Sequence, residues 1–102
     1  VIYVPETHVE AVKEAVFAAG GGRVGRYDHC CWETPGSGQF RPLDGSSPHL
    51  GRAGCVETVA EVRVELVCGE DSLDGVIRGL RSAHPYETPA FSYWPVQGVD
   101  AD

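Results

Sequence analysis

The sequence predicts a single α+β domain built in the order βαββαβ. Residues 9–19 and 73–80 carry apolar side chains at the three- and four-residue spacing of an amphipathic helix. Residues 59–68 alternate apolar and polar side chains, which is the period of a strand with one buried face. The 102 residues (10.9 kDa) suffice for one hydrophobic core, so we assign 1–97 to one domain and 98–102 to an acidic tail.

The first part of the chain predicts a strand followed by a helix. Residues 1–4 are β-branched and aromatic, which favours a buried strand that ends at Pro5. Thr7-His8-Val9-Glu10 has the form of a capping box, so we expect the Thr7 hydroxyl to cap the helix. Gly20-Gly21-Gly22 ends that helix, because glycine adopts the left-handed backbone conformation without steric cost.

The middle of the chain predicts a β-hairpin and a long loop. Residues 27–34 favour a second strand, and Pro35-Gly36-Ser37-Gly38 has the composition of a turn into a return strand at 39–42. Residues 43–56 are rich in loop-forming residues. The long strand 59–68 follows, and one of its faces carries Glu61, Arg63 and Glu65.

The last third predicts a second helix and a final strand. Glu70-Asp71-Ser72 is expected to cap the helix, which Pro85 ends. Residues 86–96 favour a strand that Pro89 and Pro95 confine to a sheet edge. The whole order is the split pattern of ferredoxin-like domains, with both helices on one face of the sheet.

The charge balance and the cysteines limit the classes of partner. Fifteen Asp+Glu against eight Lys+Arg give a net charge of −7, which argues against binding to nucleic acid or an anionic membrane. No apolar run reaches the roughly 18 residues of a membrane span, and we expect no leader. Four cysteines, at 30, 31, 55 and 68, match no zinc spacing. We expect packed, reduced thiols in the cytoplasm, with a two-disulfide framework as the alternative.

The sequence supports neither a dinucleotide-binding motif nor a Ser/His/Asp catalytic set. Gly20-x-Gly22-x-x-Gly25 matches the dinucleotide-binding expression, but here a helix precedes it and a strand follows. Pyrophosphate binding needs the reverse order, so the glycines are better explained as a helix stop. No Ser/His/Asp set can be assembled and no turn marks a nucleophile, so we assign no catalytic residue.

Two groups of metal donors stand out, at 28–31 and at 84–87. Asp28-His29-Cys30-Cys31 combines hard, borderline and soft donors, and on a strand His29 and Cys31 would share one face. His84-Pro85-Tyr86-Glu87 follows the second helix. The alternatives are a hydrogen-bonded His29 at the sheet surface and a His84 that caps the helix. Arg41 and Arg52 could hold an anion, or could simply be solvated.

Three blocks carry a resemblance to a known family: Gly25-Arg26-Tyr27-Asp28-His29-Cys30, Gly36-Ser37-Gly38-Gln39-Phe40-Arg41-Pro42 and His84-Pro85-Tyr86-Glu87-Thr88-Pro89-Ala90. Together they resemble the YqfO-type domain, which is inserted in some proteins of the NIF-three-like family and also occurs as a separate chain. The third block is also similar to the divalent-cation tolerance protein CutA. CutA and PII proteins share a ferredoxin-like fold that assembles as trimers.

The resemblance implies a PII/CutA-like homotrimer with metal or ligand sites at subunit boundaries. It does not imply the hydrolase-like activity of the larger proteins, whose dinuclear metal site belongs to a flanking domain. No basic cluster suited to a nucleotide triphosphate is present, unlike in PII. Trimer formation would bury the open sheet face and give Glu61, Arg63 and Glu65 partners in other chains.

We therefore expect a cytoplasmic homo-oligomer that binds a divalent metal or a small ligand without catalysis. In the usual strand order of a βαββαβ fold, the second and last strands lie at opposite edges, roughly 14 Å apart at about 4.8 Å per strand. His29 and His84 could then share a metal only across a subunit boundary. Glu87 and Cys30 or Cys31 are further candidate ligands, and such donors suit zinc, copper or nickel. Candidate ligand-binding residues are Arg41, Arg52 and Tyr86.

Two other functions stay open at this point. The same cleft could belong to an enzyme or a biosynthetic accessory protein that uses His29 or His84 as a general base. The chain could also be a purely structural assembly domain that needs no ligand.

Overall fold

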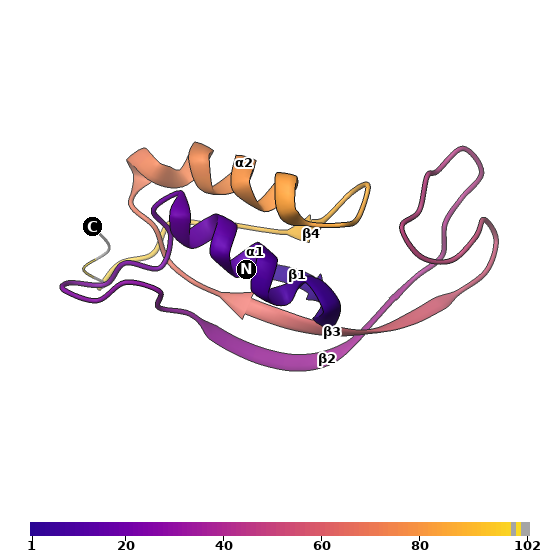
Figure 1. The fold of residues 1–102 in the computed structure, drawn as a ribbon, viewed down its shortest axis with the longest axis horizontal. Helices are drawn as coiled ribbons and strands as arrows, with labels where there is room; N and C mark the ends of the chain where they lie inside the picture. Colours follow the sequence, from indigo (N-terminus) through magenta and orange to yellow (C-terminus); the bar gives the residue numbers. More distant parts are fainter. Residues whose placement is uncertain (99, 101–102) are drawn as a thin grey trace.

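The fold is a four-stranded antiparallel sheet with two α-helices on one face (Figure 1). The computed structural model describes residues 1–98 and 100. Its elements are β1 (Ile2–Pro5), η1 (Glu6–His8), α1 (Val9–Ala18), β2 (Trp32–Phe40), β3 (Glu57–Glu65), η2 (Glu70–Ser72), α2 (Leu73–Ala83) and β4 (Ala90–Phe91). The strand order β2-β3-β1-β4 confirms the predicted ferredoxin-like arrangement, with β2 and β4 at opposite edges.

The core lies between the helices and the covered face of the sheet. Its fully buried side chains are Val4 of β1, Val12 and Val16 of α1, and Val64 of β3. Burying a valine removes its apolar surface from water and stabilises the fold by about 1.5–3 kcal/mol each. Val12 and Val16 belong to the predicted apolar stripe of the first helix, and α2 adds Val76 and Leu80.

The opposite face of the sheet is open within one chain. In the strand register Trp32 pairs with Glu65, and Tyr3 pairs with Arg63, so these four side chains share that face. Trp32 is 68% exposed and Tyr3 is 39% exposed. Large apolar side chains therefore lie in solvent on a surface that the helices do not cover.

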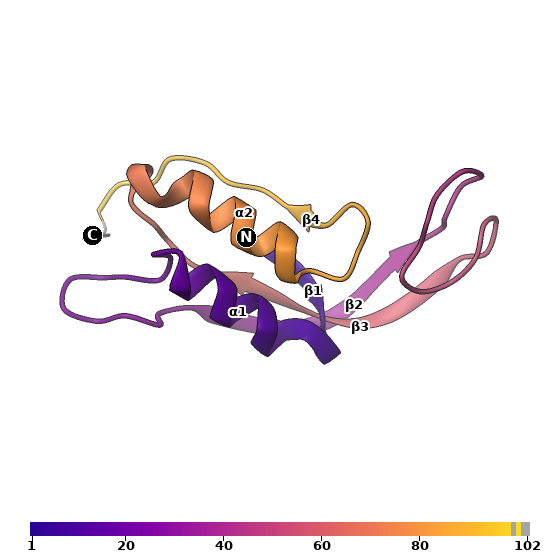
Figure 2. The same cartoon turned by 45° about the horizontal axis from the view of Figure 1, so that its top comes forward.

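The predicted turn at 35–38 is wrong, because β2 continues straight through it. Pro35 pairs with Val62 and Gly38 pairs with Val59. β2 is an edge strand, so the missing N–H of proline and the flexibility of glycine are tolerated there. The chain reverses only in the long loop 41–56, which joins β2 to β3 and extends beyond the helices (Figure 2).

The predicted helix caps are also wrong. Val9 follows a 3-10 turn that begins directly after Pro5, so His8 is the N-cap and makes no capping hydrogen bond through its side chain. The Thr7 hydroxyl lies 2.8 Å from His8 Nδ1 instead. In the same way Ser72 ends η2 and does not cap α2 through its hydroxyl. The glycine stop is confirmed, since Gly20 has a φ of 104°.

Several predicted strands differ in their bounds. The long strand predicted at 59–68 is β3 at Glu57–Glu65, and the return strand predicted at 39–42 is absent, because residues 39–40 are the end of β2.

β4 is confined to Ala90–Phe91, which pair with Tyr3 and Ile2 of β1. Residues 86–88 form a bend, and Pro89 has no N–H to extend the ladder. Strand 27–34 begins only at Trp32, since 20–31 form a loop.

The predicted acidic tail is described only in part. Its positions 99, 101 and 102 lie outside the described residues. The Asp100 carbonyl accepts a hydrogen bond of 2.7 Å from the Gly25 N–H. Among the described residues, neither α1 nor α2 has the length and hydropathy that a membrane crossing requires.

Candidate ligand-binding site

The first donor group, residues 28–31, lies in the loop before β2. Backbone bonds from Gly22 N–H to the Val67 carbonyl and from Cys30 N–H to the Gly22 carbonyl hold this loop against the end of β3. The assignment of His29 and Cys31 to one strand face is therefore wrong. His29 has a φ of 57°, and its ring centroid lies 4.9 Å from that of Phe17.

The side chains of this group do not converge on one point. His29 Nδ1 lies 3.2 Å from Asp28 Oδ1, and both side chains are largely exposed. Cys31 packs against the core, and burial raises the pKa of its thiol. A thiol is a poor metal ligand, because metals bind the thiolate. All four cysteines of the chain are free.

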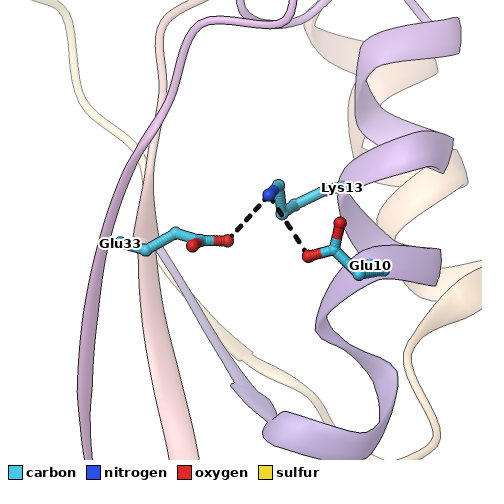
Figure 3. A network of polar contacts seen from close by, with 3 residues as sticks. All are labelled: Glu10, Lys13 and Glu33. Atoms are coloured by element: carbon cyan, nitrogen blue, oxygen red, sulfur yellow. Dashed lines mark hydrogen bonds and ion pairs between the residues drawn. The ribbon is translucent and has the colours of Figure 1, made fainter.

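Lys13 lies near Cys31 and connects α1 to β2 (Figure 3). Its Nζ lies 2.8 Å from Glu33 Oε1 on β2 and 3.3 Å from Glu10 Oε2 on α1. These carboxylates raise the pKa of Lys13, Glu33 most strongly. The contacts explain why this charged side chain lies between a helix and an edge strand.

The second donor group begins with His84, whose ring is buried and fully hydrogen-bonded. Its Nε2 lies 2.7 Å from the Tyr3 carbonyl, which requires an N–H at Nε2. Its Nδ1 then accepts a hydrogen bond of 3.2 Å from the Tyr86 backbone N–H. Burial lowers the pKa of His84, so the ring is neutral at neutral pH. A metal or a substrate proton could reach His84 only if one of these bonds broke.

The structure does not bring His29 and His84 together within one chain. The loop before β2 and the loop between α2 and β4 lie at opposite ends of the molecule (Figure 1). Among the described residues, no three His, Cys, Asp or Glu side chains form a group that could hold a metal. A metal shared between subunits therefore stays a prediction about an assembly.

Tyr86 is the centre of a cluster of rings. Its ring centroid lies 5.0 Å from His84, 5.7 Å from Phe40 and 6.3 Å from His49. Its hydroxyl donates a hydrogen bond of 2.8 Å to Glu61 Oε2. Burial and this carboxylate raise the pKa of Tyr86, so the hydroxyl stays a donor at neutral pH.

A pocket of about 250 Å³ opens beside this cluster, and we call it the Tyr86 pocket. Its lining includes Phe40, Pro42, His49, Glu61, Tyr86 and Thr88. The loops 41–56 and 84–89 meet here, at the same end of the molecule in both views (Figures 1 and 2). The Ser47 N–H donates to Glu87 Oε1 at 2.9 Å and ties the two loops together.

Glu61 reaches the pocket because β2 has a glycine beside it. The Glu61 carboxylate lies where a Cβ at Gly38 would stand, so a side chain at this position would displace it. Sequence reasoning placed Glu61 on the open face and expected a partner in another chain. Within the chain the Glu61 carboxylate accepts a hydrogen bond from Tyr86, and no local pattern could have indicated that contact. A contact of Glu61 with another chain stays a prediction.

Arg41 and Arg52 do not line the Tyr86 pocket. Both side chains are exposed, and Arg52 Nε lies 3.4 Å from Cys55 Sγ in the long loop. Among the described residues, neither arginine forms an ion pair with Glu61 or Glu87. An anion site between the two arginines stays a prediction.

Known proteins contain a segment similar to this chain. It is 53% identical over 91 residues to a GTP cyclohydrolase 1 type 2 homolog of Mycobacterium leprae, which is 89% of this chain and 24% of that protein. It is 40% identical over 101 residues to the Bacillus subtilis protein of the same name, which is 99% of this chain and 27% of that protein. The crystal structure of a Bacillus cereus protein related to NIF3 matches with a TM-score of 0.81 and 35% identity, over 97% of this chain and 25% of that chain.

The chain is a relative of the NIF3-like proteins. This bears out the NIF-three-like part of the resemblance that the three sequence blocks carry. The chain spans about a quarter of the length of these relatives. No protein-family model matches the chain.

Proposed function

We propose that this chain is a cytoplasmic, homo-oligomeric domain of PII/CutA-like type that binds a small ligand in the Tyr86 pocket and catalyses no reaction. One observation carries the proposal. A half-buried carboxylate, Glu61, is fixed by Tyr86 inside a pocket with aromatic walls. Apolar walls with a few placed polar groups are typical of sites for small molecules.

The histidines favour binding over catalysis. A general base needs a ring nitrogen within reach of the substrate proton. Both nitrogens of His84 are already hydrogen-bonded inside the fold. His29 belongs to the loop before β2, at the opposite end of the molecule from the loop between α2 and β4 (Figure 1), and it does not line the Tyr86 pocket.

An enzyme is the second candidate, and the relatives favour it. They are named homologs of GTP cyclohydrolase 1 type 2, which suggests reaction chemistry in the longer proteins. This chain corresponds to about a quarter of their length, so that chemistry would lie mainly in the other parts. Turnover of a purine nucleotide by this chain alone would support an enzyme and contradict the proposal.

A divalent metal at a subunit interface is a further form of the binding function. His29 and Glu87 are exposed, so a neighbouring copy could bring them to one zinc, copper or nickel ion. Metal analysis of protein purified without a metal-affinity tag tests this. Stoichiometric metal that His29→Ala removes would support the metal site. Metal-free protein, or metal retained by that variant, would contradict it.

Ligand-observed NMR with a chemically diverse fragment library tests the pocket. Thr88→Trp should fill the pocket, since Thr88 lines it and is exposed. Thr58→Trp is the matched control, because Thr58 is exposed on β3 and does not line the pocket. We expect fragments that bind the native chain and the Thr58→Trp chain, and that Thr88→Trp excludes. Binding that Thr88→Trp leaves unchanged would contradict the proposed function.

A further inference from the structure

The Tyr86 pocket holds two carboxylates without a cationic partner. Glu61 and Glu87 both line it. Within residues 1–98, neither forms an ion pair with a lysine or an arginine. Each uses one oxygen, Glu61 Oε2 for the Tyr86 hydroxyl and Glu87 Oε1 for the Ser47 N–H. The other oxygen of each carboxylate makes no hydrogen bond among the described residues and is available to a ligand.

Titratable groups of the fold supply little compensating charge here. The imidazoles of this region are His84, which is buried and neutral, His49, which lies in the exposed loop 41–56, and His8, whose ring centroid lies 5.5 Å from that of His49. The chain as a whole carries a net charge of −7. Its electrostatic field therefore attracts cations and repels anions. A phosphorylated ligand would meet carboxylates in this pocket and no arginine.

The walls of the pocket favour a flat ring. Phe40 and Tyr86 enclose an interplanar angle of 57°, so the two rings form adjoining apolar surfaces. Aromatic faces attract cations through their quadrupole, in addition to the apolar contact. The volume of about 250 Å³ limits the occupant to a small molecule.

The carboxylates also determine which polar groups the ligand should carry. An ionised carboxylate only accepts hydrogen bonds. A planar amidinium or guanidinium donates several N–H bonds in a fixed geometry, and such charge-assisted bonds are about twice as strong as neutral ones. A neutral amide of the same shape offers fewer donors and no charge.

We propose that the Tyr86 pocket selects a small planar aromatic cation whose charged group donates N–H bonds to Glu61 and Glu87. This inference rests on the proposed function, because it names the ligand class of the same pocket. Phe40 and Tyr86 contact the ring, and the two carboxylates bind the charged end. Gly38 is a positioning residue, since its missing side chain leaves room for the Glu61 carboxylate.

Three probes of nearly equal shape test the charge selectivity: benzamidine, benzamide and benzoate. Each is titrated into the isotope-labelled chain and followed by ¹⁵N–¹H NMR. We expect benzamidine to shift the amides of Gly38, Tyr86 and Thr88, with an affinity at least about tenfold above that of benzamide. Benzoate should bind more weakly still, because its carboxylate has the same negative charge as Glu61 and Glu87.

Charge-neutral variants test the role of each carboxylate. Glu61→Gln and Glu87→Gln keep the size of the side chain, and each should reduce the preference for benzamidine over benzamide by about tenfold or more. Glu65→Gln is the matched control, because Glu65 lies on the same strand outside the pocket. It should leave the preference unchanged. The NMR spectra also show whether each variant is folded, and Glu87 lies in a loop where substitution disturbs no strand.

The outcomes separate this inference from the proposed function. Equal binding of benzamidine and benzamide would overturn the charge selectivity, although the pocket would still bind ligands. A preference that persists in both Gln variants would overturn the roles of Glu61 and Glu87. If none of the probes shifts pocket amides, the inference fails. The proposed function then still stands if library fragments bind and Thr88→Trp excludes them.

Discussion

His84 connects three parts of the fold through one ring. Its backbone N–H bonds to the Leu80 carbonyl at the end of α2. Its side chain bonds to the Tyr3 carbonyl on β1 and to the Tyr86 N–H in the following loop. The ring therefore fixes where Tyr86 lies, and Tyr86 in turn holds Glu61. The helix-capping role expected from the sequence belongs to the backbone of His84 and not to its ring.

The buried neutral His84 predicts a dependence of stability on pH. Its native pKa lies below the ordinary value of about 6.5, so the unfolded chain binds the proton more tightly than the native chain. The free energy of unfolding should therefore fall as the pH drops below about 6.5, until the native pKa is passed. Urea unfolding from pH 7.5 to 5 measures this.

A matched pair of variants assigns this pH dependence to His84. His84→Gln should unfold more easily at pH 7.5 and lose much of the slope below pH 6.5. His29→Gln should keep the slope, because His29 is exposed. An unchanged slope in His84→Gln would contradict the assignment.

The Tyr86 hydroxyl bond predicts a second effect at the scale of one residue. Tyr86→Phe keeps the ring and removes the donor, which leaves the half-buried Glu61 carboxylate without its hydrogen bond. We expect a loss of about 1 kcal/mol in the free energy of unfolding. Tyr93→Phe serves as the control, since Tyr93 is 61% exposed. Equal stability of the two variants would show that the bond contributes nothing.

At the scale of elements, two glycines of α2 have different surroundings. A Cβ at Gly79 would lie 3.0 Å from the Ala15 carbonyl oxygen of α1, so Gly79 allows the two helices to approach closely. A Cβ at Gly75 would meet nothing nearer than 3.8 Å. Glycine inside a helix costs roughly 0.5–1 kcal/mol relative to alanine. Only at Gly79 is this cost offset, because the missing side chain lets α1 and α2 pack closely.

These surroundings predict opposite effects for the same substitution. Gly75→Ala should raise the free energy of unfolding by about 0.5–1 kcal/mol. Gly79→Ala should give no such gain, because the added methyl group would press α2 away from α1. Thermal and urea unfolding measure both variants. A similar gain in the two variants would mean that the helices do not need the close approach.

The helices and β3 were predicted from the sequence, whereas the course of β2 and the length of β4 were not. Apolar periodicity predicted both helices and the strand around Val64, because these elements bury one face in the core. The glycines and the proline of β2 predicted a turn, because these residues are typical of turns. An edge strand also tolerates them, and the local sequence does not show that this segment is an edge strand. The length of β4 was overestimated, since it pairs with only Ile2 and Tyr3 of β1 and Pro89 directly precedes it.

The site was harder to predict than the fold. Tyr86 and Glu87 were identified from a short block of sequence. Glu61, Phe40 and His49 reach the same pocket from β3, the end of β2 and the long loop. Tyr86 and Glu61 are 25 residues apart, so their contact depends on the tertiary fold. The glycine that makes room for Glu61 resembled turn composition for the same reason.

At the scale of the whole molecule, the open sheet face predicts self-association. Trp32 and Tyr3 are exposed there, beside Arg63 and Glu65. Covering such a face with copies of the chain would remove this apolar surface from water. We expect light scattering coupled to size exclusion to give close to three times 10.9 kDa.

Two exposed aromatic residues provide variants for this test. Trp32→Glu places a charge on the open face and should dissociate the trimer. Tyr27→Glu places a charge on the loop before β2, outside the sheet, and should leave the trimer intact. A native chain that runs as a monomer at micromolar concentration would contradict the assembly.

Whether the Tyr86 pocket selects a small planar aromatic cation can be seen in a crystal structure of the chain soaked with benzamidine. We expect electron density for the ring against Phe40 and Tyr86, with the amidinium nitrogens within hydrogen-bond distance of Glu61 and Glu87. Density for the probe at another site, with the Tyr86 pocket holding only water at saturating probe concentration, would contradict this expectation.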